Sequence, residues 1–167
     1  MPDEHPVRAL VMDSSADTLD LLRHYLEFHG FSVETCNLAR LRREGIDVAD
    51  TVARVRPDVI VFDIALPYDE NWEFCSALQQ DPRIEAPFVL TTTNRAAVER
   101  LTGARGVIEI LGKPYDLEHI AEAMRTAGAA RRQAGGGAPP ARHDARRGLD
   151  RRLGDRRRDQ RRKKPSS

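Results

Sequence analysis

Cysteines are few in this chain of 167 residues, and long apolar runs are absent. Cys36 and Cys75 are too few and too far apart for a disulfide framework or a zinc site, so we expect buried free thiols. No run approaches the roughly 18 consecutive apolar residues of a membrane span. The segment Met1 to Pro6 is acidic and contains prolines, unlike a signal peptide. These absences predict a soluble protein of the cytoplasm.

Motifs for common enzyme chemistry are also missing. The sequence has no glycine-rich phosphate loop and no Ser-His-Asp arrangement. Its histidines show no metal-ligand spacing, and even His24 and His29 are five residues apart, a spacing that does not place them on one helix face. We assign the histidines no chemistry.

The charge is strongly asymmetric along the chain. Residues 1–128 carry 13 Lys+Arg against 22 Asp+Glu, a net charge of −9, and residues 129–167 carry 14 against 4, a net charge of +10. An acidic body with a basic tail indicates two separate roles. The tail holds a Gly-Pro-rich stretch and almost no apolar residues. Because it buries too little surface to offset the entropy of ordering, we predict a disordered Arg-rich tail over residues 129–167.

Apolar runs alternate with helical patterns in the acidic body. Strands are expected at residues 7–12, 31–35, 59–62, 88–91 and 107–111, and helices at about 15–29, 37–55, 72–80, 94–102 and 117–127. Five strands alternating with five helices predict an α/β fold with a doubly wound parallel sheet. Right-handed crossovers place helices on both of its faces.

Four chemically useful side chains lie at the ends of apolar strands. They are Asp13, Asp63, Thr92 and Lys113, and Pro114 follows the lysine. Because ligands gather at the carboxyl edge of an open α/β sheet, we expect these side chains to lie together. Two carboxylates, a hydroxyl and a lysine are what a phosphoryl-accepting site needs.

The pattern resembles the receiver domain of bacterial two-component response regulators. The resemblance covers about residues 5–128, which we take as the domain, and it implies the flavodoxin-like strand order 2-1-3-4-5. The motifs that carry it are Val-Met-Asp-Ser-Ser at 11–15, Pro-Asp-Val-Ile-Val-Phe-Asp at 57–63, Leu-Pro at 66–67, Phe-Val-Leu-Thr-Thr at 88–92 and Gly-Lys-Pro-Tyr at 112–115.

The resemblance implies a role for each site residue. Asp63 is the phosphoacceptor, and Thr92 is the hydroxyl that bonds the phosphoryl group. Lys113 contacts Asp63, and a cis peptide bond between Lys113 and Pro114 aims the lysine at it. The neighbouring Thr91 leaves an off-by-one assignment of the hydroxyl open. The family also binds Mg²⁺, which here implies Asp13, Asp63 and the backbone carbonyl of Ala65 as ligands.

Several positions depart from the family pattern. Ser14 stands where a second acidic ligand is usual, and a neutral hydroxyl should weaken Mg²⁺ binding. Ile110 replaces the usual Tyr or Phe, and Thr93 fills a small-residue position. Asn71, in an expected loop over 67–71, replaces a glycine and is tolerable there because Asn accepts a positive φ.

Two functional hypotheses follow. The first is a stand-alone response regulator, a signalling switch and not an enzyme, which is phosphorylated by a histidine kinase or phosphotransfer protein and contacts an output protein. The second is a pseudo-receiver that is never phosphorylated and serves as a docking module. Receivers often pair through their late helices, so a homodimer is compatible with both hypotheses.

The basic tail leaves further alternatives open. It could bind nucleic acid or another polyanion without sequence specificity, contact anionic lipids, cover the acidic body, or have no function. No aromatic residue is interleaved with its arginines for base stacking.

Overall fold

The structure is a computed structural model that describes residues 5–103 and 107–135. The predicted tail therefore lies outside the described residues from residue 136 onward. Strands and helices alternate, in the order β1 (Arg8–Asp13), α1 (Ala16–Phe28), β2 (Ser32–Asn37), α2 (Leu38–Glu44), α3 (Val48–Val55), β3 (Val59–Ile64), α4 (Tyr68–Gln80), β4 (Phe88–Thr92), α5 (Arg95–Thr102), β5 (Val107–Gly112) and α6 (Leu117–Ala134).

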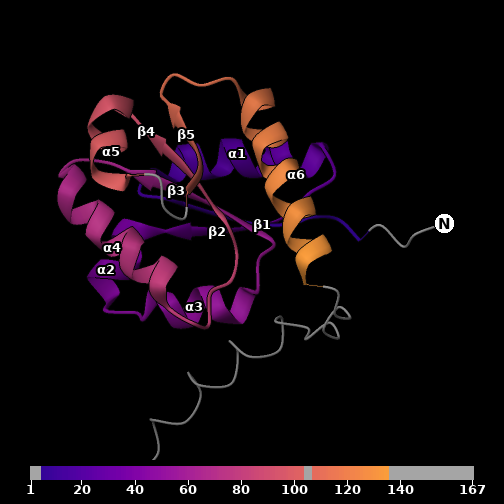
Figure 1. Ribbon diagram of the computed structural model, residues 1–167, viewed down its shortest axis with the longest axis horizontal. Coiled ribbons are helices and arrows are strands. Elements are labelled where there is room, and N and C mark those ends of the chain that lie inside the picture. The colour runs from indigo at the N-terminus through magenta and orange to yellow at the C-terminus, as the bar shows by residue number, and fades with distance from the viewer. Residues whose placement is uncertain (1–4, 104–106, 136–167) are drawn as a thin grey trace, which may run out of the picture. The chain divides into compact units, whose positions relative to one another are not determined.

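The five strands form one parallel sheet in the order β2-β1-β3-β4-β5 (Figure 1), which confirms the predicted fold class and strand order. β3 lies in the middle and is buried along its whole length. Such a continuous apolar strand is expected where helices cover both faces of a sheet. Its carboxyl end carries Asp63, so the central strand presents the central acid.

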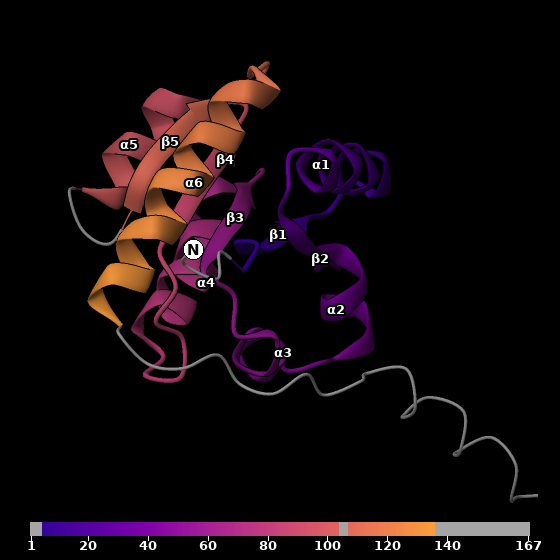
Figure 2. The same cartoon turned by 90° about the vertical axis from the view of Figure 1, so that its right-hand side faces the viewer.

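Two hydrophobic cores flank the sheet, because successive strand side chains point to opposite faces. Ala9 and Val11 of β1 pack with residues of α1 and α6 on one face. Leu10 and Met12 pack with residues of α2 to α5 on the other. Figure 2 shows the helices on the two sides of the sheet. Cys36 and Cys75 are buried and free, as expected.

The helix expected over residues 37–55 is two helices, so the described residues hold six helices and not five. Gly45 ends α2 in the left-handed region at φ +64°, which glycine adopts without steric cost. Asp47 then caps α3, with its side chain accepting a hydrogen bond from the Asp50 amide.

The loop expected over residues 67–71 was also wrong, because α4 begins at Tyr68. Asp69 and Glu70 lie in its first turn, where acidic side chains favour the positive end of the helix dipole. Asn71 is therefore helical, and among the described non-glycine residues only Arg56 has a positive φ.

α6 continues to Ala134, past the boundary expected at residue 128, so the first residues assigned to the disordered tail are helical. Its last turns are attached to the amino-terminal end of β3. Arg131 donates to the Pro57 carbonyl at 2.6 Å, and Arg132 binds the buried carboxylate of Asp58 at 3.0 Å. Arg132 also donates to the Pro6 carbonyl at 2.6 Å, which joins both ends of the described domain. Within residues 5–103 and 107–135, no helix has the length and apolarity to cross a bilayer.

Candidate functional site

Two acids and a lysine meet at the carboxyl edge of the sheet. β1 ends at Asp13, Asp63 is the penultimate residue of β3, and Lys113 follows the last residue of β5. Lys113 Nζ lies 2.8 Å from Asp63 Oδ1 and 3.3 Å from Asp13 Oδ2. The exposed fractions of Asp13 and Asp63 are only 4% and 8%. The structure thus brings together three of the four predicted side chains.

The backbone at Lys113 is hydrogen-bonded to the end of β4. The Lys113–Pro114 peptide bond is cis, as the resemblance implies, and Leu66–Pro67 is also cis. The Lys113 amide donates to the Thr92 carbonyl at 2.6 Å, which extends the pairing of β5 with β4 up to the site.

The hydroxyl that contacts Asp63 belongs to Thr91. Thr91 Oγ1 donates to Asp63 Oδ1 at 2.9 Å, whereas Thr92 Oγ1 accepts from the Asn94 amide at 3.2 Å. Strand register explains the difference, because Asp63 pairs with Thr91 and Ile64 pairs with Thr92. Directly paired residues point to the same face of a sheet. Thr92 is fully buried, and its switching role stays a prediction.

Burial is the largest influence on the pKa values of Asp63 and Lys113. Burial and then the Asp13 carboxylate raise the pKa of Asp63 above its usual value, and the bonds from Lys113 and Thr91 only partly oppose them. Burial would lower the pKa of Lys113, but its contacts with Asp63 and Asp13 raise it overall. Two carboxylates and one ammonium leave an excess of negative charge, which a further cation would neutralise.

The donor chemistry fits a small hard cation, with one acid fewer than the family pattern. Asp13, Asp63 and the Ala65 carbonyl supply oxygen atoms, which Mg²⁺ prefers. Ser14 is exposed and neutral, and within the described residues no three or more His, Cys, Asp or Glu side chains form a metal cluster. Asp13 Oδ1 also accepts from the Ser15 amide at 2.8 Å.

The Ala65 carbonyl has a partner that we did not predict. Asn71 Nδ2 donates to it at 2.9 Å, and Arg42 Nη2 donates to Asn71 Oδ1 at 2.6 Å. The substitution of the usual glycine by Asn71 was visible in the sequence. Its contacts were not, because they depend on the early start of α4 and on the end of α2.

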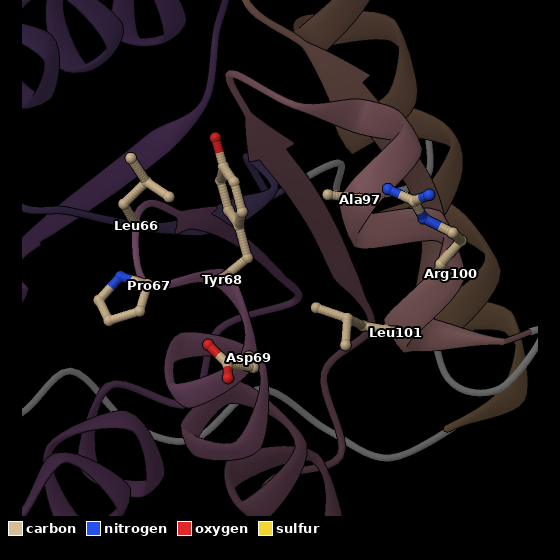
Figure 3. A pocket seen from close by; sticks show the side chains of 7 residues that line it. All are labelled: Leu66, Pro67, Tyr68, Asp69, Ala97, Arg100 and Leu101. Carbon is tan, nitrogen blue, oxygen red and sulfur yellow. The ribbon is translucent and has the colours of Figure 1, made fainter.

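A pocket of about 380 Å³ lies between the start of α4 and α5 (Figure 3). Tyr68 stands at its upper rim in that view, and the Tyr68 hydroxyl is 2.9 Å from Thr93 Oγ1. This contact joins the segment after β3 to the segment after β4. The position in β5 where the family usually has Tyr or Phe is occupied by Ile110, which is half-buried. The residues lining the pocket are Leu66, Pro67, Tyr68, Asp69, Ala97, Arg100 and Leu101.

This fold, with two acids and a lysine at its carboxyl edge, defines a receiver domain of the bacterial response-regulator type. Among curated relatives, the response regulator MprA of Mycobacterium sp. (strain KMS) is 33% identical over 121 residues, which are 72% of this chain and 50% of that protein. The chain thus spans about half the length of the curated relatives it matches. No family model matches it.

Solved structures agree on the fold. The chemotaxis protein CheY4 of Vibrio cholerae has a TM-score of 0.60 at 22% identity, over 73% of this chain and 98% of that chain. A CheY-like receiver domain protein from Methanospirillum hungatei JF-1 has a TM-score of 0.63 at 21% identity, over 78% and 99% of the two chains.

Proposed function

We propose that this protein is a response regulator of a two-component phosphorelay in the cytoplasm, which takes a phosphoryl group from a histidine kinase or phosphotransfer protein onto Asp63. It acts as a signalling switch and not as an enzyme. The observation that carries the proposal is the Lys113 ammonium 2.8 Å from a buried carboxylate that a second acid flanks. Because Lys113 and Thr91 both contact Oδ1, we take the other oxygen, Oδ2, as the attacking atom.

The transfer is a displacement at phosphorus. Asp63 Oδ2 attacks the phosphorus of a phosphohistidine, a new P–O bond forms, the P–N bond breaks, and the imidazole leaves with the bond's electron pair and takes up a proton. Lys113 then binds a phosphoryl oxygen. Asp13, Asp63 and the Ala65 carbonyl would hold Mg²⁺, which supplies positive charge to the transferring oxygens when bound.

The experiment is intact-protein mass spectrometry after incubation with acetyl phosphate, with and without Mg²⁺. We expect one phosphoryl adduct on the wild type that depends on Mg²⁺ and is absent from Asp63→Asn. A wild type that takes no label, or an Asp63→Asn variant that labels as well as the wild type, would falsify the proposal.

A pseudo-receiver that docks proteins without phosphorylation is the second candidate. The exposed, neutral Ser14 favours it, because the site has one acidic ligand fewer. Ile110, which stands where the family usually has Tyr or Phe, also favours it. A protein that ignores millimolar Mg²⁺ and takes no label would support this candidate.

We also propose an output protein, a second copy of the chain and polyanions as partners of the whole protein. An output protein would contact the surface of α5, β5 and α6, which is also where a homodimer would form. The Arg-rich tail would bind polyanions weakly, and retention on heparin should disappear when residues 135–167 are deleted. A full chain that shows no salt-dependent retention on DNA or heparin would contradict that prediction.

A further inference from the structure

Asn71 binds the backbone carbonyl that is the proposed third ligand for Mg²⁺. Its Nδ2 donates to the Ala65 carbonyl at 2.9 Å and to the Pro67 carbonyl at 3.0 Å. The Asn71 side chain is buried in the first turns of α4. Because both donor hydrogens of the amide are used on one loop, the two bonds fix the path of the chain just after β3.

A charged partner holds the amide in place. Arg42 Nη2, on α2, donates to Asn71 Oδ1 at 2.6 Å. The Arg42 guanidinium carbon also lies 4.9 Å from the centroid of the Phe74 ring, a cation–π contact with the next turn of α4. A cation at the amide oxygen polarises the amide and strengthens it as a donor. Arg42, Asn71 and Ala65 thus form a continuous chain of hydrogen bonds from α2 to the candidate metal site.

We infer that this chain of hydrogen bonds lowers the affinity of the site for divalent cations, and that Asn71 and Arg42 are positioning residues that set this affinity. The inference rests on the proposed function, because it takes the Ala65 carbonyl as a metal ligand. A carbonyl oxygen has two lone pairs, so an amide and a metal ion can share it. The positive amide hydrogens nevertheless withdraw electron density from the oxygen and repel the ion.

A Mg²⁺ titration of the full chain tests the inference, with the fluorescence of Trp72 as the readout. Trp72 is the only tryptophan and directly follows Asn71. We expect Asn71→Ala to bind Mg²⁺ about two- to tenfold more tightly than the wild type, the range of one hydrogen bond's net contribution. Arg42→Gln should bind more tightly than the wild type by a smaller factor.

Two control variants separate this effect from general electrostatics. Arg43→Gln removes the neighbouring positive charge of α2 and should leave the affinity closer to the wild type than Arg42→Gln does. Ser14→Asp restores an acid and should tighten binding, which shows that the titration reports on this site.

Equal or weaker Mg²⁺ affinity of Asn71→Ala overturns the inference, and so does an Arg43→Gln effect as large as that of Arg42→Gln. Absence of binding in every variant, Ser14→Asp included, overturns it as well. Failure of the proposed function is a different result, because Asp63 would then stay unlabelled by acetyl phosphate while the variants still differed in Mg²⁺ affinity.

Discussion

Thr91 donates its hydroxyl to Asp63 Oδ1 at 2.9 Å, from the residue directly opposite it in the sheet. The Thr91 bond lowers the pKa of Asp63 against the larger effect of burial. Thr91→Val keeps the shape of the side chain and removes the bond. We expect the pKa of Asp63 to rise, so that labelling by acetyl phosphate reaches half its maximum at higher pH than in the wild type. Thr92→Val is the matched control and should leave this pH midpoint unchanged.

Replacing Asp63 should stabilise the protein at neutral pH. Burial raises the pKa of Asp63 in the folded state, so its protonated form is favoured by folding. That stability is present below the unfolded pKa of about 3.9 and is lost as the pH rises through the higher folded pKa. We therefore expect Asp63→Asn to raise the melting temperature at pH 7, with a gain that shrinks as the pH falls below about 4. A lower melting temperature at pH 7 would contradict the raised pKa.

Replacing Asp58 should have the opposite effect and destabilise the protein at neutral pH. Burial acts to raise the pKa of Asp58, but its bonds to the Arg8 amide and the Arg132 guanidinium lower it overall. Its ionised form therefore adds stability above the unfolded pKa of about 3.9, and this is lost as the pH falls through the folded pKa. We expect Asp58→Asn to cost about 2 kcal/mol at pH 7 in urea unfolding, less than a fully buried pair costs because the arginines reach solvent. A cost that grows on acidification would refute this assignment.

The exposed apolar side chains of α1 offer a surface for the phosphodonor. Leu21 and Phe28 are 55% and 87% exposed, and their spacing places them on one face of the helix that follows Asp13. We expect the double variant Leu21→Ser, Phe28→Ser to slow transfer from a histidine kinase or phosphotransfer protein by several-fold and to leave labelling by acetyl phosphate unchanged.

The control for the α1 surface is Ile46→Ser, an exposed apolar position between α2 and α3. It should slow neither reaction. Equal loss with both phosphodonors in the α1 variant would mean that the substitutions damage the site and not the docking.

The acids and the lysine were predictable because each follows an apolar run that had to be a strand. Asp13, Asp63 and Lys113 needed only the rule that parallel strands end at one edge. The contacts of Thr91 and Asn71 were not predictable in this way, since they depend on register and on the residue where a helix begins. A shift of one residue turns a strand side chain to the other face of the sheet. The sequence motif therefore assigned the site hydroxyl to Thr92, whereas the strand register puts Thr91 opposite Asp63.

Tertiary contacts also decided where helices end. Residues 129–134 are good helix formers, but the apolar period of the helix stops at Ala127 and does not extend over them. Arg131 and Arg132 continue α6 because Pro57 and Asp58, far away in the chain, accept their hydrogen bonds. Gly45 shows the opposite situation, in which a local signal decides. Its left-handed conformation ends α2, although the apolar pattern had predicted one continuous helix over residues 37–55.

β3 keeps a carboxylate near each end, Asp58 just before its first residue and Asp63 near its last. At about 3.3 Å per residue the two acids are separated by roughly 16 Å, beyond the range at which substitutions usually couple. Thermal stability can therefore be adjusted at Asp58 without a direct effect on Asp63. An engineer could make the domain more or less resistant to heat through Asp58 and its arginines, and leave the proposed phosphorylation site at the far end of the strand as it is.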